Sequence, residues 1–310
     1  MSTPLFTLPS FAKINLSLRI LGKRPDGYHE IRTVLQTISL HDKLQFAANP
    51  GNDILFSCDD PAIPCDHRNL IVRAAHALRV RYGINRGARI QLEKRIPVQG
   101  GLGGGSSNAA VTLLGLADLW ELRKNVTELI EIASGLGADV PFFLHGGRVS
   151  AAGIGMQIAP LAEGESRHVV VIAPRATVDT ADAYKAFDSP ALTTLNSEPI
   201  LAISRTESDL ADWDQRLLHN HLENDFERVI FDIEPEIERA KGVLLQAGAL
   251  SALLAGSGSS VFGIFEDQEA QQRAVCEIPM EPGWRAFSCV TLSRDEYLRA
   301  MGPRGMPLML

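Results

Sequence analysis

A glycine-rich stretch is the part of the sequence whose composition most directly suggests binding chemistry. Five of the nine residues from Pro97 to Gly105 are glycine, so the backbone there can adopt positive φ angles and let a ligand approach bare amides. The segment from Ser106 to about Leu122 is apolar and lacks proline, which predicts a largely buried helix with Ser106 or Ser107 as its N-cap. Unpaired amides and the positive end of a helix dipole favour an anion, most commonly a phosphate.

The residues before this loop strengthen that interpretation, since a glycine-rich turn alone can be merely a tight loop. Apolar and polar residues alternate from Ala88 to Ile96, which predicts the order strand, glycine loop, helix. Lys94 falls on the apolar side of this strand, where a lysine either extends to the strand edge or pairs with a phosphate. We favour the phosphate role.

Two common phosphate loops are excluded by the residues that follow the glycines. The Walker pattern requires a lysine and then Ser or Thr after its last glycine, whereas Gly105 is followed directly by two serines. The dinucleotide spacing G-x-G-x-x-G fails because Ser106 stands where the third glycine belongs. The loop therefore belongs to another class of anion site.

Two charged residues far apart in the sequence are candidates for catalysis. Lys13 lies in the alternating segment Phe11 to Leu21, which predicts a half-buried strand with Lys13 and Asn15 on one face, about 7 Å apart. Asp139 precedes a segment that contains Pro141 and that we expect to be a strand. By themselves these residues are typical of a solvated strand face and of a turn or cap, and only the fold could bring them together.

Other segments predict the elements that hold these residues. Asn69 is expected to cap a helix from Leu70 to about Tyr82, and a second helix is expected from about Thr127 to Gly135. Strand-like segments run from residue 31 to 47, residues 51–67 are rich in loop formers, and a strand is expected at 168–173. Residues 251–265 predict two strands joined by a glycine- and serine-rich loop. The polar stretch after residue 158 suggests a change of domain there.

Composition limits the class of protein. The chain has 310 residues, 45% hydrophobic and 22% charged, which is ordinary for a globular protein of one or two domains. Its net charge of −7 and the absence of a basic cluster argue against nucleic-acid binding. We find no signal peptide and no apolar window long enough to span a membrane, so we expect a cytoplasmic protein. The four cysteines lack metal-site spacing and are expected to be free thiols.

The run from Pro97 to Ala110 resembles the P-x-x-x-G-L-G-S-S-A-A loop of the GHMP kinases, named for galactokinase, homoserine kinase, mevalonate kinase and phosphomevalonate kinase. The resemblance extends from Phe11 to about Phe265 and includes four motifs in order. It implies an α+β, two-domain GHMP kinase fold. Residues 1–158 would form an ATP-binding domain like ribosomal protein S5 domain 2, and residues 159–310 a ferredoxin-like, substrate-binding domain.

The segment from Gly22 to Glu30, together with Ala12-Lys13-Ile14-Asn15-Leu16, resembles one branch of that family. That branch phosphorylates the 2-hydroxyl of a sugar alcohol carrying a cytidine diphosphate group, in the non-mevalonate isoprenoid pathway. By resemblance, Tyr28 stacks on the cytosine and His29 bonds to it. Without the resemblance, the same segment would indicate a turn at Pro25-Asp26-Gly27 with a surface tyrosine.

The resemblance also implies a role for each remaining candidate residue. Asp139 would be the general base and Lys13 its catalytic partner, stabilising and orienting the carboxylate. Thr180 and Tyr184 would contact the substrate, with Tyr184 closing a sandwich around the cytosine opposite Tyr28, and Asn15 would join them. The expected ATP-binding residues are Asn69, Lys94, Pro97, Val98, Gln99, Gly100, Gly101, Leu102, Gly103, Gly104, Gly105, Ser106 and Ser107.

The implied cofactors are ATP, as phosphoryl donor, and Mg²⁺. No carboxylate in the sequence is an unambiguous Mg²⁺ ligand, and Ser107 is the one side chain considered for it, so no metal-binding residue is assigned. The expected partner is a small molecule with a cytidine diphosphate group; we expect no nucleic acid, no membrane and no obligate protein partner. Two alternatives stay open: another GHMP kinase of the homoserine or mevalonate type, and a non-catalytic nucleotide-binding protein.

Overall fold

The computed structural model describes residues 5–123, 125–188 and 222–305. Its first part contains β1 (Leu5–Lys23), β2 (His29–Asn49), β3 (Ile54–Cys58), α1 (Leu70–Tyr82), β4 (Gly87–Glu93), α2 (Gly104–Leu119), α3 (Val126–Leu136), α4 (Val140–His145), β5 (Arg148–Gly153) and β6 (Gln157–Pro160). Its second part contains β7 (His168–Ala173), α5 (Thr180–Phe187), β8 (Glu223–Asn224), α7 (Glu227–Ile233), α8 (Pro235–Gln246), β9 (Ser251–Leu254), β10 (Val261–Phe265), α9 (Gln268–Glu277), β11 (Arg285–Val290) and α10 (Arg294–Gly305).

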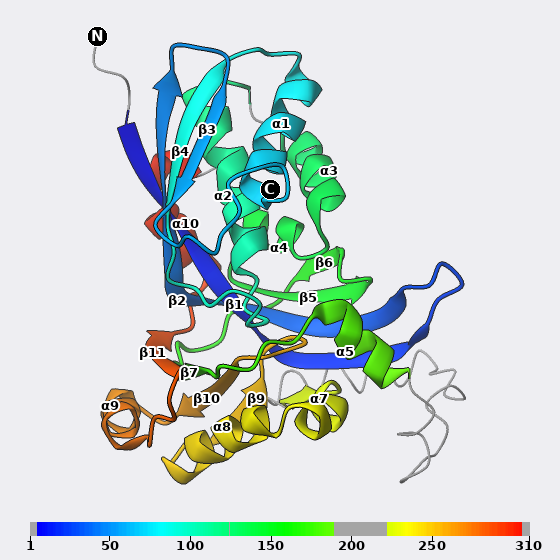
Figure 1. Cartoon of the computed structure of the whole chain (residues 1–310), viewed down its shortest axis with the longest axis vertical. Helices are drawn as coiled ribbons and strands as arrows, with labels where there is room; N and C mark the ends of the chain where they lie inside the picture. The colour runs from blue at the N-terminus through cyan, green and yellow to red at the C-terminus, as the bar shows by residue number, and fades with distance from the viewer. Residues whose placement is uncertain (1–4, 124, 189–221, 306–310) are drawn as a thin grey trace.

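A long antiparallel hairpin of β1 and β2 runs through the molecule (Figure 1). It belongs to a seven-stranded sheet with the order β3-β4-β2-β1-β8, in which β5 pairs with β2 and β6 pairs with β5. Both faces of the middle of β1 are buried, including Lys13, Asn15 and Ser17. The prediction of a half-buried strand was therefore wrong, because other parts of the chain cover its polar face as well.

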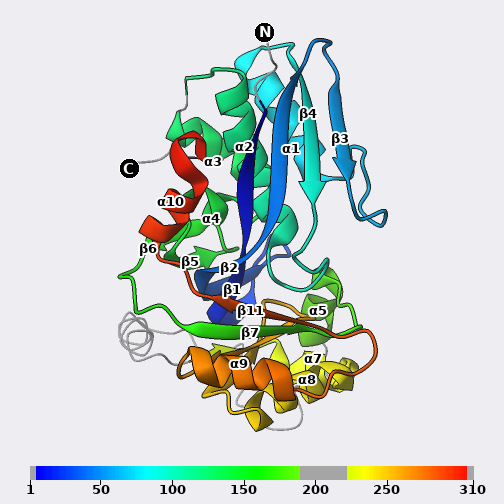
Figure 2. The ribbon, with the colours of Figure 1, turned by 90° about the vertical axis from the view of Figure 1, so that its left-hand side faces the viewer.

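Helices α1 to α4 lie behind the upper part of this sheet in Figure 2, and α10 lies beside its β1 edge. Their apolar faces and the strands enclose a core that includes Phe46, Leu78, Leu113 and Phe142, all fully buried. Helix α1 has the predicted bounds: the Asn69 side chain accepts a hydrogen bond from the amide of Ile71 at 2.9 Å. The first turn of this helix is thereby capped as expected.

The second sheet has four antiparallel strands in the order β11-β7-β10-β9. Numbered along the chain, this is the order 4-1-3-2 with helices between strands 1 and 2 and between 3 and 4, as in a ferredoxin-like fold. Helices α8 and α9 cover the face away from the first part (Figure 2). The opposite face packs on the first sheet, so β7 is apolar on both sides: Val170 faces one core, and Val169 and Val171 face the other.

The chain returns to the first part at its end. In α10, Tyr297 and Met301 are buried in the core of the first sheet and its helices. The Tyr297 hydroxyl donates a hydrogen bond to the carbonyl oxygen of Phe143 at 2.5 Å. Residues 294–305 thus pack with the first part, although we assigned residues 159–310 to the second domain. The boundary near residue 158 stays a prediction.

Three local predictions were wrong. The helix expected from Ser106 begins at Gly104 and ends at Leu119, and its N-cap is Gly103 without a side-chain hydrogen bond. The loop-rich stretch 51–67 contains strand β3. The segment after Asp139 is the short helix α4 with Pro141 in its first turn, where proline is tolerated because the first amides of a helix have no internal partner.

The predictions of free cysteines and of no membrane-spanning segment can be compared with the structure. All four cysteines are free, as expected. Within the described ranges, no helix combines the length and the apolar character needed to cross a membrane.

Candidate active site

A cavity of about 1070 Å³ lies where the glycine loop, the β1–β2 hairpin, α5 and the 255–260 loop meet. All predicted catalytic and substrate-binding residues line it, as do all predicted ATP-binding residues except Ser107. Segments distant in the sequence therefore contribute to one site. The cavity also includes residues that the sequence did not suggest, among them Lys23, Asp188 and Ser257.

The glycine loop forms one wall of the cavity and leads into α2. Gly101 and Gly103 both have φ of +70°, a conformation that favours glycine. A Cβ on Gly101 would lie 1.8 Å from the carbonyl oxygen of Ala255, so a side chain is also excluded by contact. Since no side chain caps α2, the amides of its first turn remain available to an anion.

Lys13 and Asp139 meet in this cavity, as the resemblance predicted. The Nζ atom of Lys13 lies 3.5 Å from Oδ2 of Asp139, and the side chains are 5% and 38% exposed. Lys13 also donates a 2.7 Å hydrogen bond to Asn15 Oδ1, and Asn15 donates one of 2.7 Å to Thr33. The ammonium group is thus fixed from the buried side, while the carboxylate remains accessible from the cavity.

Backbone contacts explain why these two residues meet beside the glycine loop. The amide of Lys13 donates to the carbonyl oxygen of Leu102 at 3.0 Å, which joins β1 to the loop. Asp139 is the N-cap of α4, a helix that packs against α2. The Phe143 ring of α4 fills the space beside Gly103, where a Cβ would come within 2.7 Å of it. The carboxylate is therefore held at the start of α4, a helix that packs against the one that carries the bare amides.

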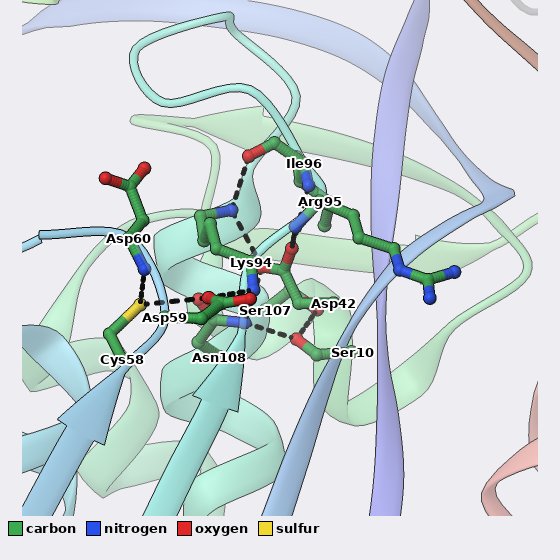
Figure 3. A network of polar contacts seen from close by, with 10 residues as sticks. All are labelled: Ser10, Asp42, Cys58, Asp59, Asp60, Lys94, Arg95, Ile96, Ser107 and Asn108. Atoms are coloured by element: carbon green, nitrogen blue, oxygen red, sulfur yellow. Dashed lines mark hydrogen bonds and ion pairs between the residues drawn. The ribbon is translucent and has the colours of Figure 1, made fainter. Parts of the chain in front are cut away.

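Beneath the glycine loop, the buried carboxylate of Asp42 accepts four hydrogen bonds (Figure 3). Its Oδ1 accepts from the amides of Arg95 and Ile96 at 2.7 and 2.8 Å. Its Oδ2 accepts from Lys94 Nζ at 2.8 Å and from Asn108 Nδ2 at 3.0 Å. Asp42 is fully buried, and it connects the end of β4 with the first turns of α2. It thereby fixes both ends of the glycine loop.

Lys94 lies just beyond the end of β4, and its side chain is only 7% exposed. Besides Asp42, its ammonium group donates to the carbonyl oxygen of Ile96 at 2.5 Å. Lys94 therefore lines the cavity but is already paired, because Asp42 lies directly beneath it. Its predicted contact with a nucleotide phosphate stays a prediction.

Ser107 differs from the expectation for it. It is fully buried, its hydroxyl accepts a 2.8 Å hydrogen bond from Ser10, and its amide donates to the carbonyl oxygen of Gly103 at 2.8 Å. The side chain therefore points into the network of Figure 3 and not into the cavity. Because α2 begins at Gly104, Ser107 is already inside the helix, and the structure offers no support for its ATP or Mg²⁺ contact.

At the other end of the cavity, aromatic side chains of the hairpin and α5 come together. Tyr28 is 62% exposed, whereas His29 is buried and stacks on Tyr184, with ring centroids 4.5 Å apart and planes at 17°. The structure places no ring contact between Tyr28 and Tyr184, so the cytosine sandwich stays a prediction. Thr180 is hydrogen-bonded through its hydroxyl to that of Ser257 at 3.0 Å.

Two pKa values in this region are shifted. Burial, with the nearby charge of Asp139, raises the pKa of Tyr184 to about 12, so its hydroxyl keeps its proton at neutral pH. Burial by itself raises the pKa of Asp188, but hydrogen bonds from Lys23 and His29 outweigh it and hold this pKa below its ordinary value. Asp188 is therefore an acceptor only.

The site also shows what sequence reasoning missed. Asp42 stands between His41 and Lys43 in a strand, without a motif around it, and its partners depend on strand register. Asp188 follows the predicted contact Tyr184 by one helical turn, and that spacing is the signal that could have found it. Ser257 lies in the glycine- and serine-rich loop expected between the two strands of residues 251–265, and that pattern did not indicate a contact with the cavity.

The expected Mg²⁺ ion can be compared with the side chains and backbone groups that line the cavity. In the described part of the chain, no group of three or more His, Cys, Asp or Glu side chains is placed to hold a metal ion. The cavity wall at α2 offers backbone amides and the Ser106 hydroxyl. Amide NH groups bind phosphate oxygens and cannot coordinate a cation, so a Mg²⁺ ion that arrives with the nucleotide would be held mainly by phosphate oxygens and water.

Comparison with known families agrees with this geometry. Residues 69–147 match the family described as GHMP kinases N terminal domain, and residues 207–279 match GHMP kinases C terminal. Among solved structures, a homoserine kinase from Cytophaga hutchinsonii superimposes with a TM-score of 0.67 at 18% identity, covering 94% of this chain and 96% of that one. At this low identity, the similarity to the homoserine kinase concerns the fold alone. It agrees with the predicted two-domain GHMP kinase fold.

More similar proteins share one description. A 4-diphosphocytidyl-2-C-methyl-D-erythritol kinase from Caldanaerobacter subterraneus is 39% identical over 267 residues, 86% of this chain and 90% of that protein. One from Prosthecochloris aestuarii is 42% identical over 275 residues, 86% of this chain and 92% of that protein. A crystal structure of 4-(cytidine 5'-diphospho)-2C-methyl-D-erythritol kinase has a TM-score of 0.73 at 32% identity, covering 92% of this chain and 99% of the other. Identity of this extent, together with both domain matches, shows that the chain belongs to the 4-diphosphocytidyl-2-C-methyl-D-erythritol kinase family of GHMP kinases.

Proposed function

We propose that this protein transfers the γ-phosphoryl group of ATP to the 2-hydroxyl of 4-diphosphocytidyl-2-C-methyl-D-erythritol, a step of the non-mevalonate isoprenoid pathway. The observation that carries the proposal is the 3.5 Å pair of Lys13 and Asp139, which lies in the same cavity as the bare amides of the glycine loop. A base, a cation and an anion cradle are the parts that phosphoryl transfer to an alcohol requires.

The nucleotide occupies the side of the cavity formed by α1, the glycine loop and α2. The first-turn amides of α2 and its dipole hold the phosphates without a neutralising side chain. Asn69 lies at the N-terminus of α1 with both ends of its side-chain amide bonded to the chain, and we place the adenine beside it. Lys94 contributes positive charge near the loop through a side chain held by Asp42.

The acceptor occupies the side formed by the hairpin and α5. Tyr28 offers an exposed ring on which a cytosine can stack, and His29 offers a hydrogen-bonding ring edge. Thr180 and Tyr184 line the same cavity. We place the middle of the acceptor against them, with its cytosine at Tyr28 and its reacting hydroxyl at Asp139. Asn15 orients Lys13 and completes the wall at the reacting hydroxyl.

The chemical step follows from the position of Asp139. Its carboxylate accepts the proton of the substrate hydroxyl as the oxygen attacks the γ-phosphorus, and the bond between that phosphorus and the β,γ-bridging oxygen breaks to leave ADP. Lys13 stabilises the carboxylate and supplies positive charge near the transferred group. Mg²⁺ bound with ATP would neutralise part of the phosphate charge.

The direct test combines the purified protein with ATP, Mg²⁺ and a panel of acceptors that includes homoserine and mevalonate. We expect ADP release with 4-diphosphocytidyl-2-C-methyl-D-erythritol, and a new phosphomonoester signal in the ³¹P spectrum of the product. Release of ADP with homoserine or mevalonate in its place would assign another GHMP kinase activity. ATP binding without ADP release for any acceptor would indicate a non-catalytic nucleotide-binding protein.

A further inference from the structure

Asp188, which the proposed chemistry does not use, joins the two elements that form the acceptor side of the cavity. It follows α5 directly, and α5 lies alongside the β1–β2 hairpin (Figure 1). Its Oδ1 is 2.8 Å from Nε2 of His29, and its Oδ2 accepts a 2.6 Å hydrogen bond from Nζ of Lys23. Each oxygen thus binds one end of the loop that carries Tyr28.

These contacts determine where His29 holds its proton. The Asp188 carboxyl is ionised near neutral pH, since its pKa lies below the ordinary value, and a carboxylate can only accept hydrogen bonds. The hydrogen between the two residues therefore belongs to Nε2 of His29. In the neutral ring, Nδ1 is then left with a lone pair and is an acceptor.

The ring is also fixed in orientation. It is 7% exposed, it stacks on Tyr184 at 4.5 Å, and its Nε2 is bound to Asp188. Among the residues that the structure describes, Nδ1 of His29 has no hydrogen-bond partner. A fixed acceptor next to the exposed Tyr28 ring is suited to the 4-amino group of a cytosine.

We infer that Asp188 is a positioning residue that sets the tautomer and orientation of His29, and so determines how tightly the cytidine diphosphate group is bound. The inference rests on the proposed function, because that function supplies the pyrimidine. It concerns binding of the acceptor alone. Asp188 touches neither the nucleotide side of the cavity nor the Lys13–Asp139 pair.

The test uses Asp188→Asn, which keeps the shape of the side chain but can present an NH₂ group as well as an oxygen. CDP is the probe for the acceptor side, and ADP is the probe for the nucleotide side and for correct folding. The matched control is Asp182→Asn, on the same helix, because Asp182 is 69% exposed and pairs with Lys185. Isothermal titration measures both affinities, and ¹⁵N-histidine NMR reports the tautomer of His29.

In the wild type we expect a hydrogen on Nε2 of His29, which donates it to Asp188. In Asp188→Asn we expect a mixed tautomer signal, a Kd for CDP raised about tenfold, as for loss of one charge-assisted hydrogen bond, and a higher KM for the acceptor with little change in kcat. The affinity for ADP should stay within about twofold of the wild type. Asp182→Asn should match the wild type in all of these measurements.

Several results would overturn the inference. They are unchanged CDP affinity in Asp188→Asn, an equal loss of ADP affinity, a wild-type ring protonated on Nδ1, and weaker CDP binding with an unchanged ¹⁵N spectrum. Failure of the wild type to bind CDP would contradict the proposed acceptor itself. If the wild type binds CDP and turns over the acceptor, and Asp188→Asn does so equally well, only the role of Asp188 is contradicted.

Discussion

Asp139 combines access to the cavity with a fixed cation at its side. Its side chain is 38% exposed, while that of Lys13 is 5% exposed and held by Asn15. The carboxylate can therefore reach a substrate hydroxyl without losing its partner. The sequence identified both residues through motifs, but only the fold shows that the Lys13 amide is bonded to the glycine loop and that both charges face one ligand.

Replacement of the base tests this arrangement. In Asp139→Asn we expect kcat to fall about 10² to 10⁴-fold, because an amide cannot take the hydroxyl proton. The KM for ATP should change little, since the glycine loop remains intact. ADP release at saturating substrates measures the effect, and turnover equal to the wild type would remove Asp139 from the chemistry.

At the scale of elements, the glycine loop depends on backbone conformation as much as on sequence pattern. The order strand, loop, helix was predicted correctly, and α1 begins after its Asn69 cap and ends at Tyr82, as expected. The start of α2 was missed because a glycine in the left-handed region ended the loop, where we expected a serine to cap the helix. The preference of serine for the N-cap position does not predict a helix that begins after a glycine without a capping side chain.

Gly101→Ala should be strongly destabilising. Its φ of +70° is unfavourable for alanine, and the added Cβ would lie 1.8 Å from the carbonyl oxygen of Ala255. We expect a loss of at least about 2 kcal/mol of stability together with weaker ADP binding. Denaturant unfolding and titration with ADP measure these effects.

The control for this variant is Gly135→Ala in α3, where a Cβ would meet nothing within 4 Å. That substitution should stabilise the protein by a few tenths to about 1 kcal/mol, because alanine favours a helix. If Gly101→Ala unfolds at the same denaturant concentration as the wild type, the close approach of the loop to Ala255 is not present in solution.

Asp42→Asn tests the network beneath the loop. The substitution leaves Lys94 buried without its counter-charge, which costs about 3–5 kcal/mol in comparable buried pairs. We expect a correspondingly large fall in the unfolding free energy. Glu93→Gln is the control, because Glu93 forms half-exposed pairs with Lys43 and Arg95, and its loss should lower stability far less than Asp42→Asn does.

Equal stability of the Asp42→Asn and Glu93→Gln variants would contradict the role given to Asp42. The sequence could not reveal this role. The partners of Asp42 come from the segment just after β4 and from α2. The pairing of β2 with β4 brings the first of these beside Asp42, and the packing of α2 brings the second.

At the scale of the whole molecule, the two parts share a buried interface. Ile14, Val34 and Ile38 of the first sheet pack against Val169, Val171 and Phe262 of the second. The amides of Ser259 and Ser260 also donate to the carbonyl oxygens of Gln99 and Gly100, both at 3.2 Å. The polar stretch after residue 158 indicated two domains. The sequence could not show that they share a core, because a strand that is apolar on both faces, such as β7, does not reveal what covers each face.

We therefore expect the protein to unfold as one unit. The shared core and the contacts of α10 with the first part should couple the two parts, so that neither loses its structure alone. Scanning calorimetry should give a single transition whose calorimetric and van't Hoff enthalpies agree. Two separate transitions would mean that the interface contributes little to stability.

The position of α10 has a consequence for synthesis on the ribosome. Phe143 of α4 accepts its hydrogen bond from Tyr297, so the helix that begins at the proposed general base receives one of its supports only when the last described helix has been translated. A nascent chain can contain the glycine loop, Lys13 and Asp139 while that support is still missing. Competence for phosphoryl transfer should therefore appear late during translation, after α10 has been synthesised and has packed against α4.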